Sequence, residues 1–404
     1  MKNLPKKIIL TSTLVACTTA YAQQFEDAAS MEFGGFDFTP TVDLGLEYDD
    51  NVTQSNTDEI DSWSRTIAPQ LNLFTTYGAS DVEFSYRLVN RDYFSSDTDN
   101  FTDHFLRAAT NLELNARNRI RASLNYEDGH DARGTNFSIG QGQTLSEPDQ
   151  YKQSELDFEY SYGAFNADGR LDLNVNLLDK NYDSDSIIYQ ARDRKYSTLG
   201  GTFYYRVGAN TDLTFDAYRT YVDYDIALDN ANPLDSVQDS FLVGVDWEAT
   251  AKTSGFAKIG YQTKDFDSAF REDFSGVDWA LGVQWEPLEY SSIEVSTESN
   301  TNETNGEGNF IRGNVHSIEW RHDWLERVRS TVGFAYLNNR YEGQIVDGFD
   351  VRSDNDVRFN ASVYYQFRRW LNFELTYRHN ERDSNREQVE FDRNRLLLNA
   401  FITL

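Results

Sequence analysis

The residues of this chain that could carry catalysis are a histidine and its acidic neighbours. His130 lies between Asp128 and Asp131, so a base and two carboxylates fall close together in the sequence. Hydrolases use such groups as a general base and its orienting acid. Neither a Gly-x-Ser-x-Gly nor a His-Glu-x-x-His motif accompanies them. We therefore predict that the protein is not an enzyme and has no catalytic residues, and we keep a hydrolase centred on His130 as an alternative.

Carboxylates also gather in two clusters, Asp97-Thr98-Asp99-Asn100 and Asp183-Ser184-Asp185. Calcium loops add a glycine and a terminal glutamate at fixed spacing, and both clusters lack them. Cys17 is the only cysteine, so a cysteine-based metal site is excluded. The sequence predicts solvated loops at both clusters, no metal site and no cofactor.

The N-terminal residues have the pattern of an export signal. Three lysines, Lys2, Lys6 and Lys7, precede an apolar run that ends before the small-residue triplet Ala20-Tyr21-Ala22. This predicts a signal peptide over residues 1–22. In the alternative interpretation, the segment Leu14-Val15-Ala16-Cys17 is a lipoprotein cleavage box and Cys17 carries a lipid.

The remaining chain is strongly acidic and rich in aromatic residues. The full sequence has a net charge of −29, and cleavage after Ala22 would remove three lysines and leave −32. Nucleic acid is an improbable partner for such a surface, because phosphate binding requires basic side chains. An aromatic content of 14% argues against disorder, despite a mean hydropathy of −0.64.

Apolar and polar side chains alternate from about Phe38 to Leu404, a period that predicts β-strands. Clear apolar phases are Leu156-Phe158-Tyr160-Tyr162, Val277-Trp279-Leu281-Val283-Trp285 and Val357-Phe359-Ala361-Val363-Tyr365-Phe367. No uncharged stretch reaches the roughly 20 residues that a membrane-spanning helix needs. Any insertion into a membrane must therefore use strands.

The polar breaks between these runs alternate in length. Short breaks lie near 78–80, 115–118, 163–168, 208–210, 251–254, 287–290, 325–327 and 368–370. Longer ones lie near 50–61, 95–100, 129–150, 183–192, 225–237, 267–274, 303–309, 342–352 and 384–387. Eight short turns and nine longer loops separate eighteen strands. The pattern predicts an all-β fold, a transmembrane antiparallel up-and-down β-barrel with short periplasmic turns and longer extracellular loops.

A soluble sandwich, propeller or solenoid would also alternate, but it has no reason to collect its long loops at one end. Aromatic residues at strand ends suit the two lipid headgroup regions instead. They are Tyr48, Tyr77, Tyr93, Trp247, Trp285, Trp324, Tyr341 and Trp370. We predict a periplasmic leader over residues 23–36 and an outer-membrane barrel of a Gram-negative bacterium over 37–404. Eighteen strands leave an aqueous channel unless a loop plugs it.

The polar strand faces would line this lumen, with charges distributed unevenly around the ring. The predicted basic wall contains Arg87, Arg107, Arg121, Arg321, Arg358, Arg378 and Arg395. The predicted acidic wall contains Glu155, Asp157, Glu159, Asp172, Asp246, Glu248 and Asp278. Opposed walls would set up a transverse field that orients dipolar solutes such as sugars. In the alternative interpretation, the charges pair with one another and hydrate the lumen.

The longest break, residues 129–150, has two possible placements. It is rich in glycine and carries His130, Arg133, Phe137 and Glu147. Such a loop either folds inward as a constriction of the channel or forms outer surface.

The first hairpin carries a more specific pattern than alternation. It reads Phe38-x-Pro40-x-Val42-x-Leu44-x-Leu46-x-Tyr48-Asp49-Asp50-Asn51-Val52, followed by Ile67-Ala68-Pro69-x-Leu71-x-Leu73. This hairpin resembles the putative β-barrel porin 2 family, outer-membrane barrels found in exopolysaccharide and capsule gene clusters. The later strands agree only in style. The sequence departs from the usual aromatic C-terminus of outer-membrane barrels, because it ends at Leu404.

The resemblance implies an outer-membrane pore that exports exopolysaccharide or capsular polysaccharide together with a periplasmic export protein of the Wza-like type. We further expect contacts with outer-membrane lipid and lipopolysaccharide, and insertion by the barrel assembly machinery. An uptake porin for oligosaccharides or small solutes is the alternative within transport. Alternatives of other classes are an outer-membrane hydrolase and a structural or adhesive barrel.

Overall fold

The computed structural model describes residues 30–229, 232–250, 252–343 and 350–403. The predicted signal peptide, Cys17 and the first part of the predicted leader lie outside the described residues. The strands are β1 Met31–Phe33, β2 Phe36–Asp49, β3 Ser62–Tyr77, β4 Ser80–Tyr93, β5 Phe101–Asn115, β6 Asn118–Asp131, β7 Asp149–Tyr162, β8 Gly169–Tyr182, β9 Arg194–Gly208, β10 Thr211–Tyr224, β11 Ser236–Thr250, β12 Thr253–Phe266, β13 Phe274–Leu288, β14 Ser291–Glu303, β15 Phe310–Leu325, β16 Val328–Glu342, β17 Ser353–Arg368, β18 Leu371–Ser384 and β19 Phe391–Thr403. The helices are α1 Ile187–Gln190 and the 3-10 turns η1 Asp97–Asp99, η2 Asn136–Ser138, η3 Gly142–Thr144 and η4 Glu387–Val389.

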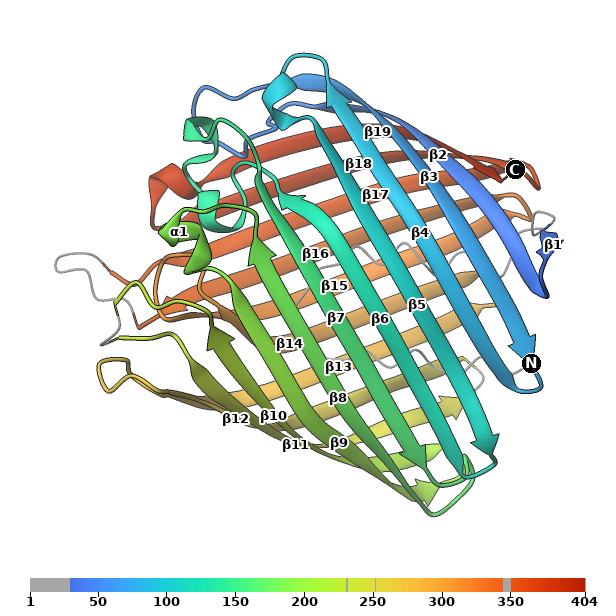
Figure 1. The fold of residues 1–404 in the computed structure, drawn as a ribbon. Coiled ribbons are helices and arrows are strands. Elements are labelled where there is room, and N and C mark those ends of the chain that lie inside the picture. Colours follow the sequence, from blue (N-terminus) through green and yellow to red (C-terminus); the bar gives the residue numbers. More distant parts are fainter. Residues whose placement is uncertain (1–29, 230–231, 251, 344–349, 404) are drawn as a thin grey trace.

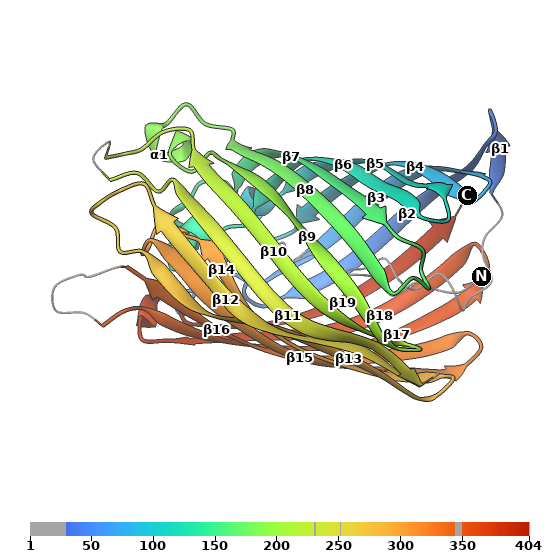
Figure 2. The same ribbon diagram turned by 90° about the horizontal axis from the view of Figure 1, so that it is seen from below.

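Strands β2 to β19 form a closed ring. Each pairs antiparallel with the strand before it and the strand after it. The last strand returns to the first, in a ladder that runs from Arg395 opposite Asp49 to Thr403 opposite Thr41. Figures 1 and 2 show the resulting barrel of tilted strands. The predicted barrel of eighteen strands is confirmed.

The connections at the two ends of the barrel differ in length, as the spacing of the breaks predicts. One end, here called the short-turn end, has tight links such as Gly78–Ala79 between β3 and β4. The other end, here called the long-loop mouth, holds α1 and the four 3-10 turns (Figure 1). The longest connection is shorter than the predicted break, because β6 continues through Asp131 and β7 begins at Asp149.

A small hairpin precedes the barrel in the segment predicted as a leader. Strand β1 pairs with β2, from Met31 opposite Phe38 to Phe33 opposite Phe36. Gly34 and Gly35 turn the chain with φ of +60° and +84°, a backbone region that favours glycine. A strand of three residues is too short to show the alternation of apolar and polar side chains that identifies the longer strands.

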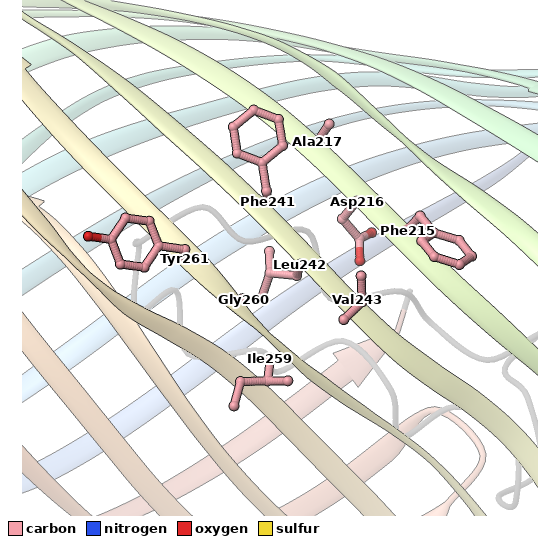
Figure 3. Close-up of a pocket in the computed structure, with 9 residues that line it drawn as sticks. All are labelled: Phe215, Asp216, Ala217, Phe241, Leu242, Val243, Ile259, Gly260 and Tyr261. Carbon is pink, nitrogen blue, oxygen red and sulfur yellow. The ribbon is translucent and has the colours of Figure 1, made fainter.

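The alternation of side chains separates an apolar outer face from a polar inner face. On β2, Leu44 and Leu46 on the outer face are 40% and 42% exposed, whereas Glu47 on the inner face is 3% exposed. A depression of about 430 Å³ lies on the outer face over β10 to β12, where Phe241 and Ile259 are exposed. Figure 3 shows the residues that line it. The exposed apolar face is the surface that suits lipid. No helix among the described residues is long and apolar enough to cross a membrane.

One seam of the ring is only partly paired. The β13–β14 ladder runs from Leu288 opposite Ser291 to Ala280 opposite Glu298 and stops there. Beyond this point, Phe274 to Trp279 pair with β12 alone, and Ser299 to Glu303 pair with β15 alone. Toward the long-loop mouth, β13 and β14 are therefore not paired with each other, whereas β15 stays paired with β16 up to Phe310 opposite Glu342.

We predict that a charge is tolerated on the inner face but not on the outer face of the same strand. Val363 lies opposite Leu375, which lies opposite Leu398, in an outward row that is about half exposed. Val363→Arg should lower the free energy of unfolding by about 2–4 kcal/mol if this row lies near the middle of the bilayer. Urea titration in lipid vesicles measures the loss. The adjacent inward change, Ser362→Arg, is the control, and an equal loss in both variants would contradict the assignment of faces.

Candidate functional site: the lumen and its mouth

The predicted basic wall contains several arginines that already hold an acidic partner. Arg87 contacts Asp43 through Nη2 and Oδ2 at 3.0 Å. Arg121 contacts Glu159, a member of the predicted acidic wall, through Nη1 and Oε1 at 3.2 Å. Arg358 lies 3.7 Å from Asp356. The two predicted walls therefore meet and pair at β6 and β7.

The other predicted basic residues have different surroundings. Arg107 donates a hydrogen bond of 2.7 Å from Nη1 to Oδ1 of Asn125. Arg321 lies between Ser292 and Thr331 in the strand register. Arg378 and Arg395 lie directly opposite each other on β18 and β19. Like charges in such a position repel each other.

The predicted acidic wall is held largely by hydrogen bonds. Asn176 donates to Glu155 and Asp157 at 2.9 and 2.7 Å. Asp278 accepts from Ser240 at 2.7 Å. Asp172, 1% exposed, lies 3.8 Å from Nε of Arg170.

The remaining two predicted acidic residues, Asp246 and Glu248, lie near the short-turn end of β11. Asp246 lies opposite Asp212 in the strand register. The backbone N–H of Glu248 donates to the carbonyl of Asn210.

Lysines within the acidic wall are the main feature that the sequence pattern missed. Lys258 on β12 reaches Asp216 on β10 at 2.9 Å, passing the intervening strand β11. Gly244 makes this reach possible, because a Cβ there would lie 2.6 Å from Cγ of Lys258. Gly200 accommodates the ring of Tyr218 in the same way. A glycine in the polar phase of a strand is the sequence signal that could have identified these close approaches.

Loops from several sides of the ring are tied together across the long-loop mouth. Arg133, between β6 and β7, donates to Asp99 from Nε at 2.8 Å and to Ser96 from Nη2 at 3.2 Å. Arg133 and Asp99 are 5% and 4% exposed. The hydrogen bonds that Arg133 donates to Asp99 raise the pKa of Arg133, so its guanidinium remains charged. The buried ion pair joins the β4–β5 loop to the β6–β7 loop.

The β6–β7 loop also reaches the loops near the closure of the ring. Gln143 donates to the carbonyl of Thr57 at 2.8 Å. A Cβ on Gly140 would lie 2.9 Å from the carbonyl oxygen of Gln388. Residues 132–148 therefore contact both the β2–β3 and the β18–β19 connections.

The same loop contacts the far side of the barrel. A Cβ on Gly306, between β14 and β15, would lie 3.5 Å from Cδ1 of Phe137. Seven strands, β7 to β13, lie between β6 and β14 in a ring of eighteen, so this contact spans the mouth. Of the two placements predicted for residues 129–150, the structure supports the one that narrows the channel.

The β14–β15 tip, residues 304–309, lies at the centre of this network. Glu307 contacts Arg352 at 3.0 Å and Arg386 at 3.8 Å, from the β16–β17 and β18–β19 connections. Below the tip, Glu303 contacts Lys264 and accepts from Tyr224 at 3.0 Å. Lys264 is fully buried. The partly unpaired hairpin is therefore bound to the inner face of the wall.

The predicted catalytic arrangement at His130 takes a different form in the structure. Nδ1 of His130 lies 2.9 Å from Oδ1 of Asp103, and its ring packs 4.0 Å from that of Phe101. Asp131 instead accepts from Tyr182 at 2.7 Å, and Asp128 lies opposite His104 in the strand register. Asp128 and Asp131 are thus not the partners of His130, because the strand pairing directs each toward another residue.

The two acidic clusters considered for cations have other partners. Asp99 is bonded to Arg133, and Asp183 lies 3.1 Å from Nζ of Lys152. In the part of the chain that the structure describes, no three histidine, cysteine or acidic side chains gather in a geometry that could hold a metal ion.

We predict that weakening the mouth network raises the single-channel conductance. Glu307→Gln would remove the charge that ties the β14–β15 tip to Arg352 and Arg386 in the next two long connections. Recordings in planar bilayers should show larger or longer openings. Lys152→Gln breaks a rim pair in which both side chains are about half exposed or more and should leave the conductance unchanged. Equal traces for wild type and Glu307→Gln would contradict a role of the network in closing the mouth.

We also predict that the lumen arginines control ion selectivity. Combining Arg358→Glu and Arg378→Glu would reverse two positive charges on the inner face, so the permeability ratio of K⁺ to Cl⁻ should rise about twofold or more. Reversal potentials under a salt gradient measure the ratio. Arg219→Gln on the outer face, where the exposed Arg219 side chain is paired with Asp239, is the control. An unchanged permeability ratio would contradict the hypothesis of a transverse field in the lumen.

Comparison with solved structures places the fold among outer-membrane porins. OccAB2 of Acinetobacter baumannii superposes with a TM-score of 0.51 at 12% identity, covering 92% of this chain and 99% of that one. OprD of Pseudomonas aeruginosa gives 0.47 at 12% identity, with 94% and 97% covered. The FrpB iron transporter of Neisseria meningitidis gives a TM-score of 0.47 at 12% identity. This match covers 87% of this chain but only 63% of the FrpB chain. At these identities the likeness concerns the fold alone.

Comparison of the sequence gives a more specific result. No curated protein matches this chain. The family model described as putative beta-barrel porin 2 matches residues 26–403, nearly the whole chain, whereas the resemblance noted in the sequence rested on the first hairpin. This chain is an outer-membrane β-barrel and belongs to the putative beta-barrel porin 2 family.

Proposed function

We propose that the protein is a conduit for the export of exopolysaccharide or capsular polysaccharide across the outer membrane. The observation that carries the proposal is a ring of eighteen strands with a polar inner face. A ring of this size leaves an aqueous channel. Its charged and amide side chains can exchange hydrogen bonds with the hydroxyl groups of a hydrated sugar chain. The protein performs no chemistry on its cargo.

The orientation of the barrel fits this direction of transport. In bacterial outer-membrane barrels the short turns face the periplasm and the longer loops face outward. Cargo would enter at the short-turn end, delivered by a periplasmic polysaccharide export protein, and would meet the long-loop mouth last. Closing the mouth between export events would limit leakage of small solutes. Lipid and lipopolysaccharide surround the outer face, and the barrel assembly machinery inserts the chain.

Uptake of oligosaccharides or other small solutes is the second candidate. The tied loops at the mouth favour it, because a network such as that of Glu307, Arg352 and Phe137 would sieve solutes by size before they enter. Export instead requires that the network opens for a polymer. The two functions therefore differ in the size of cargo that crosses the mouth.

We predict that deletion of the gene abolishes surface polysaccharide and leaves the uptake of small sugars intact. Immunoblots or lectin binding on whole cells measure the polysaccharide, and growth on oligosaccharides as sole carbon source measures uptake. Re-expression of the wild-type chain should restore the polysaccharide. Normal polysaccharide in the deletion strain would overturn export, and a selective growth defect on oligosaccharides would favour the uptake function.

A further inference from the structure

Two arginines in the lumen face each other without an acidic partner. Arg378 on β18 and Arg395 on β19 occupy directly opposed positions in the ladder. Both belong to the inward phase, because their neighbours Tyr377 and Leu396 are 40% and 45% exposed on the outer face. Opposed residues on neighbouring strands hold their Cβ atoms about 4.5–5.5 Å apart. The guanidinium groups therefore share one region of the lumen.

Neighbouring arginines show that carboxylates were available to neutralise the pair. Asp49 lies opposite Arg395 in the β19–β2 ladder, but its carboxylate is bonded to Arg393, and Asp356 is bonded to Arg382 at 2.6 Å. Over the described ranges, no acidic side chain lies within ion-pair distance of Arg378 or Arg395. The Nε of Arg395 is buried and has no hydrogen-bond partner. The chain has 66 acidic and only 37 basic residues. Two opposed arginines destabilise the fold by charge repulsion, and no carboxylate in the described part of the chain offsets this repulsion.

An aromatic surface lies on the same inner face, toward the short-turn end. The rings of Tyr364 on β17 and Phe401 on β19 lie 6.4 Å apart. Tyr364 is opposite Glu374, which precedes Arg378 by four residues, or about 13 Å at the rise of a strand. Sugar rings pack their apolar faces on aromatic rings, so a saccharide on this surface could reach the arginine pair with its next residues.

We propose that Arg378 and Arg395 form an anion-binding subsite for an acidic saccharide, whose carboxylate takes the place of the missing acidic side chain. Guanidinium groups bind carboxylates through paired hydrogen bonds, and two of them can hold both oxygens. Tyr364 and Phe401 support the sugar rings that precede the carboxylate. The inference rests on the proposed transport of a saccharide and adds its chemical class, a polymer that contains uronic acids.

Equilibrium binding to the purified full chain in detergent tests the subsite. Isothermal titration with tetragalacturonate should give measurable binding that weakens with added salt, whereas maltotetraose of the same length should bind far more weakly. Arg378→Gln and Arg395→Gln should each weaken tetragalacturonate binding about tenfold, since each removes charge-assisted hydrogen bonds. Arg107→Gln, which removes a lumen arginine bonded to Asn125, is the matched control and should bind as the wild type does.

A second measurement separates a binding role from a structural one. Because either substitution relieves repulsion between two positive charges, Arg395→Gln should unfold at a higher temperature than the wild type. Weaker binding together with higher stability is the expected result. Wild-type affinity in both variants, equal loss in the Arg107→Gln control, or no binding by the wild type would overturn the subsite. The gene deletion tests export independently of these results. If deletion abolishes surface polysaccharide, export is supported even when the binding experiment overturns the subsite.

Discussion

The requirement that every backbone N–H and C=O group be hydrogen-bonded within lipid determines the rest of this structure. A β-strand within lipid satisfies its backbone groups only when it is paired with a strand on each side. The last strand must therefore pair with the first, which closes the ring. The ladder between β19 and β2 is that return. In a closed ring, the number of strands, here eighteen, fixes the width of the lumen. The polar interior follows, because side chains alternate and the outer face must be apolar.

Within the ring, most basic side chains of the inner face are paired with acidic ones. Acidic residues exceed basic ones by nearly two to one, and most lumen arginines and lysines have taken one of these acids as a partner. Inward glycines extend the reach of a side chain past a neighbouring strand, as at Gly244 below Lys258. Arg378 and Arg395, which lie opposite each other, depart from this pattern. An unpaired cation is conspicuous here because carboxylates are plentiful.

The sequence predicts what depends on short-range periodicity. Alternation and the spacing of the polar breaks give the strand count and the assignment of the two ends, and the loop predicted over 129–150 differs from the structure by only a few residues at each end. Contacts between distant parts of the chain were not predictable in this way. The partner of His130 is Asp103 on the neighbouring strand, not Asp128 or Asp131, and only the register between β5 and β6 decides this. Likewise, the strand pattern of β13 and β14 contains no sign that the ladder between them stops at Ala280 opposite Glu298.

The contact between Phe137 and the β14–β15 tip has an evolutionary consequence. Surface loops usually accept substitutions and length changes independently of one another. Here the loop that carries Phe137 touches Gly306, a residue in another connection nearly half a turn around the ring. A lengthened or shortened loop on one side would have to be compensated on the other. Relatives of this protein should therefore show covariation between these two connections, although they are far apart in the chain.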